Sequence, residues 1–141
     1  MNISVRYQSR GGNTKTVADA IAKAVGVIAE PIDTPVNEPI DLLIVGGGVY
    51  AWGLDTALKT WLKNLDTAKI KRIAAFTTAG GMDKTKDILE AAKAKGIPVC
   101  EETLAVKFLL KGHAFFGQAG KAKLNDNQIA AINEFAAKIT S

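Results

Sequence analysis

The stretch Tyr7-Gln8-Ser9-Arg10-Gly11-Gly12-Asn13-Thr14-Lys15-Thr16 lies where an apolar strand pattern ends and a helical pattern begins. Small hydroxylated residues and glycines at such a junction predict a pocket for a phosphate group. The first backbone N–H groups of a helix are free there, and the helix dipole adds partial positive charge. The alternative is a tight turn in which Asn13 caps the helix. A chain that binds phosphate here binds a nucleotide or a flavin, and other segments have to provide a seat for the ring.

Strand and helix patterns alternate along the rest of the chain. Short apolar runs predict strands at 3–7, 27–32, 42–45, 73–76 and 99–106. Helical periodicity predicts helices at 13–25, at 83–94 and from residue 125 onward. It predicts a further helix with Leu54, Leu58, Trp61 and Leu65 on one stripe. This alternation indicates an α/β fold with a parallel sheet, in a single domain spanning 1–141.

The last helix carries a start signal of its own. Asn125 is expected to cap it, with Gln128 three positions later completing a capping box. The apolar face of this helix is expected to consist of four residues: Ile129, Ile132, Ala136 and Ile139.

Composition and charge narrow the function classes. The chain is 48% hydrophobic and 23% charged, with no run long enough to cross a membrane. A strand pattern follows Met1 directly, which predicts a cytoplasmic protein without a signal peptide. Cys100 is the single cysteine, so no intramolecular disulfide is possible, and we expect it to be a small core residue. The net charge of +4 favours an acidic partner but is too small to indicate nucleic acid.

Three loops are expected at the carboxyl edge of the sheet, where ligands of open parallel sheets bind. The first, Ser9 to Thr14, lacks the triphosphate and dinucleotide glycine patterns, so a single phosphate fits it better. The second is Gly46-Gly47-Gly48-Val49-Tyr50-Ala51-Trp52-Gly53, whose glycines allow a close backbone approach. Its two aromatic side chains offer a surface for a flat ring, or else fold back onto the sheet. The third, Thr77-Thr78-Ala79-Gly80-Gly81, offers small residues and backbone donors.

The first loop resembles the phosphate loop of the flavodoxin family, Thr/Ser-x-Thr/Ser-Gly-Asn-Thr. Ser9, Gly12, Asn13 and Thr14 match it, whereas Gly11 stands where the family has a hydroxyl. The resemblance runs along essentially the whole chain. It implies a flavodoxin-like three-layer sandwich with a five-stranded parallel sheet in the order 2-1-3-4-5. It also implies FMN at the switch point, with its phosphate on the first loop and its ring between the other two.

Two departures from the family bear on function. Typical flavodoxins are strongly acidic, whereas this chain is basic. Many carry an aromatic side chain in the third loop, where this chain has Gly80, Gly81 and Met82, so the ring is expected to be open on one side. The lost hydroxyl at Gly11 is expected to be offset by Arg10, Lys15 and backbone donors.

The resemblance implies an FMN-dependent electron carrier between redox enzymes, with no metal and no catalytic residue of its own. One alternative is an FMN-dependent reductase or oxidase of a quinone or another small acceptor. The other is a flavin-free binding module with the same fold, which the glycine at position 11 favours. Outside the three loops, a basic stretch is either a solvated face or a docking site for an acidic redox partner: Lys59, Lys63, Lys69, Lys71 and Arg72. His113, in the patternless segment 107–123, is expected to be a surface or loop-anchoring residue.

Overall fold

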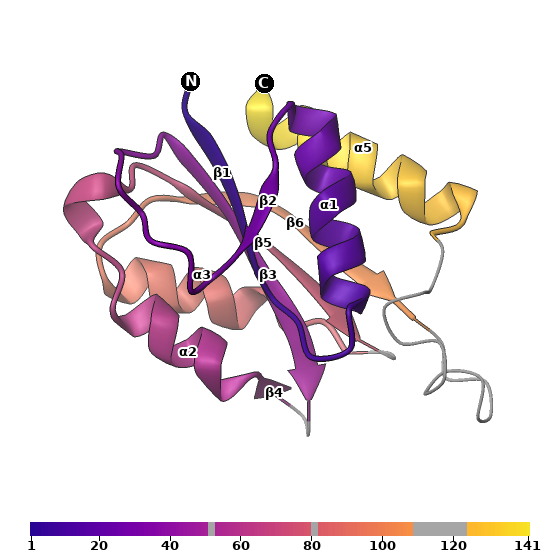
Figure 1. Ribbon diagram of the computed structural model, residues 1–141, viewed down its shortest axis with the longest axis horizontal. Helices are drawn as coiled ribbons and strands as arrows, with labels where there is room; N and C mark the ends of the chain where they lie inside the picture. The colour runs from indigo at the N-terminus through magenta and orange to yellow at the C-terminus, as the bar shows by residue number, and fades with distance from the viewer. Residues whose placement is uncertain (51–52, 80–81, 109–123) are drawn as a thin grey trace.

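The fold is a parallel sheet with helices packed on both faces (Figure 1). It is seen in a computed structural model that describes residues 1–50, 53–79, 82–108 and 124–141. Ala51, Trp52, Gly80, Gly81 and the segment 109–123 lie outside the described residues, so the expectations placed on them stay predictions.

The strand order matches the predicted one. β1 (Ile3–Gln8), β2 (Ala29–Pro31), β3 (Leu42–Tyr50), β5 (Ile73–Ala79) and β6 (Val99–Lys107) pair in parallel in the order β2-β1-β3-β5-β6. The short β4 (Gly53–Leu54) pairs antiparallel with the end of β3 and stands off this path. Apart from β4, this is the order 2-1-3-4-5, and the predicted fold class is confirmed.

Two layers of helices enclose the sheet. α1 (Asn13–Val25) and α5 (Asp126–Thr140) share one hydrophobic core with one face of the sheet. α2 (Thr56–Lys63) and α3 (Thr85–Ala94) share a second core with the other face, and a 3₁₀ turn, η1 (Thr67–Lys69), precedes β5. β3 and β5 contribute to both cores, which is why their sequences are continuous apolar runs. No helix among the described residues has the length and apolar character needed to span a membrane.

Local signals placed the helix ends well. α1 has the predicted bounds and ends at Gly26, whose φ of 82° is the left-handed conformation of a C-cap. The capping box of α5 is confirmed, because Asn125 accepts from the Gln128 N–H and Gln128 accepts from the Asn125 N–H. The apolar face of α5 was only partly right. Ile129 is 42% exposed, and Phe135 joins the buried residues instead.

The second loop was expected to begin at Gly46 and the third at Thr77, but β3 runs to Tyr50 and β5 to Ala79, so both expectations were wrong. A Cβ on Gly46 would come within 2.4 Å of the Phe76 ring and the Phe76 carbonyl oxygen. One on Gly47 would come within 2.6 Å of Leu58 Cδ2. These glycines therefore make room for core side chains, and the connection between β3 and β4 starts only after Tyr50.

Candidate functional site

The ends of β1, β3 and β5 meet at one edge of the sheet. Gln8 pairs with Gly47, and Gly48 pairs with Thr78, so the residues that follow these strands are brought close together. Two contacts join them directly. The Arg10 N–H donates to the Tyr50 hydroxyl at 3.2 Å, and the hydroxyls of Thr14 and Thr78 are 2.7 Å apart.

The first of the three loops leaves the start of α1 uncapped by any side chain. The N-cap is Gly12, with φ of 94°, and it makes no side-chain capping bond. The interpretation of Asn13 as the cap was therefore wrong, because Asn13 is the first helical residue. The Ser9 hydroxyl accepts from the Gly12 N–H at 2.9 Å and keeps its own hydrogen to donate. With no acidic residue in the first turn, this helix start suits an anion.

Two buried polar atoms at this edge have no hydrogen-bond partner among the described residues. They are the amide oxygen of Asn13 and the hydroxyl of Thr77. Leaving a buried polar group unpaired costs about 1–3 kcal/mol, so most such groups in proteins have a partner. Unpaired polar atoms next to an uncapped helix start are typical of a site that binds a polar ligand.

Thr14 and Thr78 have a role that the sequence did not reveal. Thr14 is 1% exposed, and its hydroxyl forms a hydrogen bond with that of Thr78, which links α1 to β5. Both residues were expected to contact a ligand. Their hydroxyls join the first loop to the third, which holds the start of α1 at the carboxyl end of β5. Contact of these two residues with a ligand stays a prediction.

Tyr50 is turned back toward the first loop. A Cβ on Gly48 would come within 2.5 Å of the Tyr50 hydroxyl oxygen, so the third glycine makes room for this side chain. The Arg10 guanidinium lies over the Tyr50 ring, 4.3 Å from its centroid. The strand pairs Val49–Leu54 and Tyr50–Gly53 form the hairpin that carries the ring. The Tyr50 side chain thus lies over Gly48 and against the first loop, and its contact with a ligand stays a prediction.

Both cations of the first loop are paired with carboxylates. Arg10 Nε lies 2.6 Å from Asp55 Oδ2, and Lys15 pairs with Asp19 one helical turn away at 2.7 Å. Asp55 is 5% exposed and caps α2 by accepting from the Ala57 N–H. Burial acts to raise the pKa of Asp55, but the hydrogen bonds from Ala57 and Arg10 outweigh it and hold this pKa below its usual value. Sequence reasoning missed Asp55, although an Asp just before a helical pattern is an N-cap signal.

The family model for the flavodoxin domain matches residues 4–126 of this chain. The chain belongs to the flavodoxin family. Its fold is similar to that of a flavodoxin from the domain Archaea, with 18% identity, a TM-score of 0.67 and coverage of 97% of this chain and 99% of that one. It is also similar to two-electron reduced flavodoxin from Megasphaera elsdenii, with 19% identity, a TM-score of 0.65 and coverage of 96% and 98%.

A third similar structure is a flavoprotein in complex with FMN from Lactobacillus acidophilus NCFM. It shares 16% identity, with a TM-score of 0.57 and coverage of 85% of this chain and 99% of that one. At these identities the similarity concerns the fold. Among curated protein sequences, none matches this chain.

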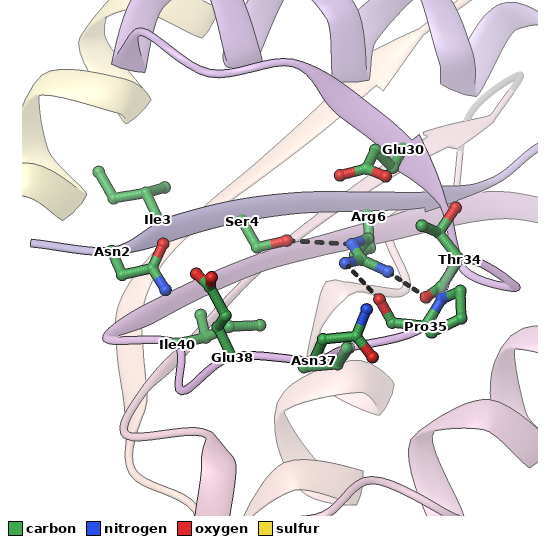
Figure 2. A pocket seen from close by; sticks show the side chains of 11 residues that line it. Asn2, Ile3, Ser4, Arg6, Glu30, Thr34, Pro35, Asn37, Glu38 and Ile40 are labelled. Carbon is green, nitrogen blue, oxygen red and sulfur yellow. Dashed lines mark hydrogen bonds between the residues drawn. The ribbon is translucent and has the colours of Figure 1, made fainter.

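A second polar hollow of about 350 Å³ lies beside β1 in this flavodoxin-family chain (Figure 2). Arg6, 5% exposed, is directed into it from the middle of β1. Its Nε donates to Ser4 Oγ at 3.0 Å, and its terminal nitrogens donate to the carbonyl oxygens of Thr34 and Pro35. These contacts hold the crossover before β3 against β1. Arg6 lies within the strand pattern at 3–7, and nothing in the neighbouring residues marks it as a buried cation.

The basic stretch does not form one face. Lys59 lies near the site, because its Nζ is 3.7 Å from where a Cβ on Gly53 would be. Lys71 and Arg72 lie at the opposite end of the sheet, just before β5. There Lys71 pairs with Asp41 at 3.1 Å, and Arg72 donates to the Ile139 carbonyl. His113 lies outside the described residues.

Proposed function

We propose that this flavodoxin-family chain binds FMN at the carboxyl edge of its sheet and carries electrons between redox enzymes. The observation that supports this most is the amide oxygen of Asn13, which is buried beside an uncapped helix start and has no hydrogen-bond partner in the described part of the chain. Such an oxygen needs a hydrogen-bond donor, and the helix start needs an anion. FMN has both, as hydroxyl groups on its ribityl chain and as its phosphate.

The residues present fit the phosphate end of FMN. In the proposed complex the phosphate is held by the first backbone N–H groups of α1, at Asn13 and Thr14, and by the hydroxyl of Ser9. Ser9 can donate while it still accepts from the Gly12 N–H. Gly11 supplies only its backbone, so the phosphate depends on main-chain donors more than it does in relatives with a hydroxyl at this position.

The ring is proposed to lie between the second and third loops. Tyr50 and Ala79 are the described residues that flank this place. The expected contacts of Ala51, Trp52, Gly80 and Gly81 with the ring stay predictions, because these residues lie outside the described ones. Bound FMN would supply the redox chemistry, so the chain needs no acid, base or nucleophile of its own. What the chain contributes is binding, orientation and the local charge that sets the potential.

The test is titration of the purified apoprotein with FMN, followed by visible absorbance and flavin fluorescence. Saturable binding with shifted flavin bands is expected, and its absence up to millimolar FMN would remove the proposal. A carrier should give up its electrons to a partner protein only. Steady turnover of NAD(P)H with a quinone, without added reductase, would instead indicate an FMN-dependent reductase.

The partner is proposed to be an acidic redox protein. Lys59 lies at the rim of the site, on α2, and the chain as a whole carries a net charge of +4. Electron transfer to an acidic partner is then expected to slow as salt rises, because screening weakens the attraction that steers the two proteins together. A rate that is independent of salt would contradict this part of the proposal.

A further inference from the structure

Among the described residues, the side chain of Arg10 contacts the hairpin of β3 and β4 and the residue that follows it. Its guanidinium lies over the ring of Tyr50, and its Nε is paired with Asp55, the residue just after β4. Its backbone N–H also donates to the Tyr50 hydroxyl. Although Arg10 lies in the first loop, its side chain acts as a clamp on the hairpin formed by the end of β3 and by β4.

Asp55 keeps this clamp in place. Its carboxylate is 5% exposed, and Arg10 is the cation that it contacts among the described residues. A buried carboxylate without a cation is strongly destabilised. Turning Arg10 toward a phosphate would create that situation, so the ion pair with Asp55 competes directly with phosphate for the guanidinium.

The clamp also sets the direction of the Tyr50 ring. The hydroxyl end of Tyr50 lies against Gly48, where a Cβ on residue 48 would not fit. The face of the ring lies under the guanidinium. A cation held over an aromatic face stabilises this arrangement. Tyr50 and the hairpin border the proposed seat of the flavin ring.

We infer that Arg10 is a positioning residue for the ring half of the flavin site and is not a ligand of the phosphate. This inference rests on the proposed FMN site. It reverses the expectation from the sequence, where a cation in a phosphate loop was expected to offset the missing hydroxyl at Gly11.

Comparing FMN with riboflavin tests the inference, because riboflavin lacks the phosphate. Arg10→Ala is expected to weaken both ligands by a similar factor of about tenfold, as befits one lost cation–π contact and one lost ion pair. Lys15→Ala is the matched control, since it removes the same charge from the helix start without touching Tyr50. It is expected to leave riboflavin affinity within about twofold, because an exposed ion pair contributes little.

Two results would overturn the inference. One is an Arg10→Ala variant that loses FMN affinity but keeps riboflavin affinity, as a phosphate ligand would. The other is a wild-type protein that binds FMN but no riboflavin at millimolar concentration, since its ring seat would then provide no affinity. Failure of the wild type to bind FMN at all would instead remove the proposed function.

Amide hydrogen exchange on the ligand-free protein tests the clamp separately from flavin binding. Arg10→Ala is expected to speed exchange at Val49 and Leu54, the paired residues of the hairpin, while Lys15→Ala leaves them unchanged. Asp55→Asn keeps a good N-cap but removes the charge, and is expected to speed the same amides. Arg10→Lys, which keeps the charge, should recover part of the protection. Unchanged exchange in Arg10→Ala would overturn the clamp.

Discussion

Arg6 and Arg10 stand four residues apart, and they belong to two regions of opposite character. Arg6 lies in the polar hollow of Figure 2, where one hydroxyl and two backbone carbonyls surround its guanidinium. Arg10 lies at the carboxyl edge of the sheet, 60% exposed, next to a helix start without a side-chain cap. In the hollow the chain itself supplies acceptors for Arg6. The edge contains two buried polar atoms that have no partner among residues 1–50, 53–79, 82–108 and 124–141.

This difference indicates where a ligand belongs. A buried cation that the chain has surrounded with its own acceptors stabilises the fold, and a ligand there would have to displace those acceptors. Unpartnered polar atoms lower stability unless something else pairs with them, and stability given up at one place is typical of functional sites. Variants in the two regions should therefore fail in opposite ways.

The largest effect is expected for Arg6→Met, which keeps much of the volume but removes every donor. The carbonyl oxygens of Thr34 and Pro35 lose their partner, so the free energy of unfolding should fall by about 1–3 kcal/mol. FMN affinity should stay within about twofold, as measured beside urea unfolding of the apoprotein. Glu38→Gln, an exposed change in the same hollow, should alter stability by less than about 0.5 kcal/mol. Lost FMN affinity with unchanged stability would move the functional site to the hollow.

Asn13→Ala should show the reverse of Arg6→Met, with weaker FMN binding and unchanged stability. Removing an amide oxygen that has no partner within the described ranges, and inserting the best helix former, should leave the free energy of unfolding unchanged or raise it by about 0.5 kcal/mol. FMN should bind about tenfold more weakly, because one hydrogen bond is lost. Asn125→Ala is the control, since it removes the cap of α5 and none of the groups proposed to hold FMN. It should cost about 1 kcal/mol of stability without affecting FMN. Equal FMN affinity in Asn13→Ala and the wild type would contradict the proposed site.

Gly11→Thr restores the hydroxyl that relatives carry and should tighten FMN binding about threefold to tenfold. The backbone permits it, because among the described glycines positive φ occurs at Gly12, Gly26 and Gly96 but not at Gly11. Fluorescence titration with FMN and with riboflavin measures the gain, which should be confined to FMN. Gly12→Ala, strained at φ of 94°, should weaken binding instead. If Gly11→Thr has no effect or weakens FMN binding, this loop does not hold phosphate as the family does.

The smallest effect is expected in the pH dependence of the free energy of unfolding. The folded-state pKa of Asp55 lies below its usual value near 3.8, so the stability it contributes is complete above that pH. This stability is lost as the pH falls below 3.8 toward the folded-state pKa. The free energy of unfolding of the wild type should therefore decline more steeply below about pH 4 than that of Asp55→Asn. Chemical denaturation at pH 7, 5, 4 and 3 gives the comparison, and parallel curves for the two proteins would show that the Arg10–Asp55 pair contributes nothing.

Much of the fold could be predicted because its signals are local. The bounds of α1, its end at Gly26 and the capping box at Asn125 depend on residues within about four positions of one another. The strand order followed from the alternation of elements together with the family resemblance. The bounds of β3 could not be obtained this way. Gly46 and Gly47 lie in β3 and are glycines because the side chains of Phe76 and Leu58 occupy the space that a Cβ would need. Neither of these partners is near in sequence.

The candidate site also has some features that follow from local sequence and others that follow from distant residues. The sequence by itself indicated the glycine turn after β1, since turn chemistry is written in consecutive residues, whereas β3 and β5 both run past their predicted ends. Only the tertiary structure paired Arg10 with Asp55, 45 positions away, and Thr14 with Thr78, 64 positions away. Such pairs form because the parallel sheet sets the ends of distant strands side by side. The sequence therefore placed a cation in a phosphate loop, whereas the sheet determined that this cation is held by a carboxylate and an aromatic ring.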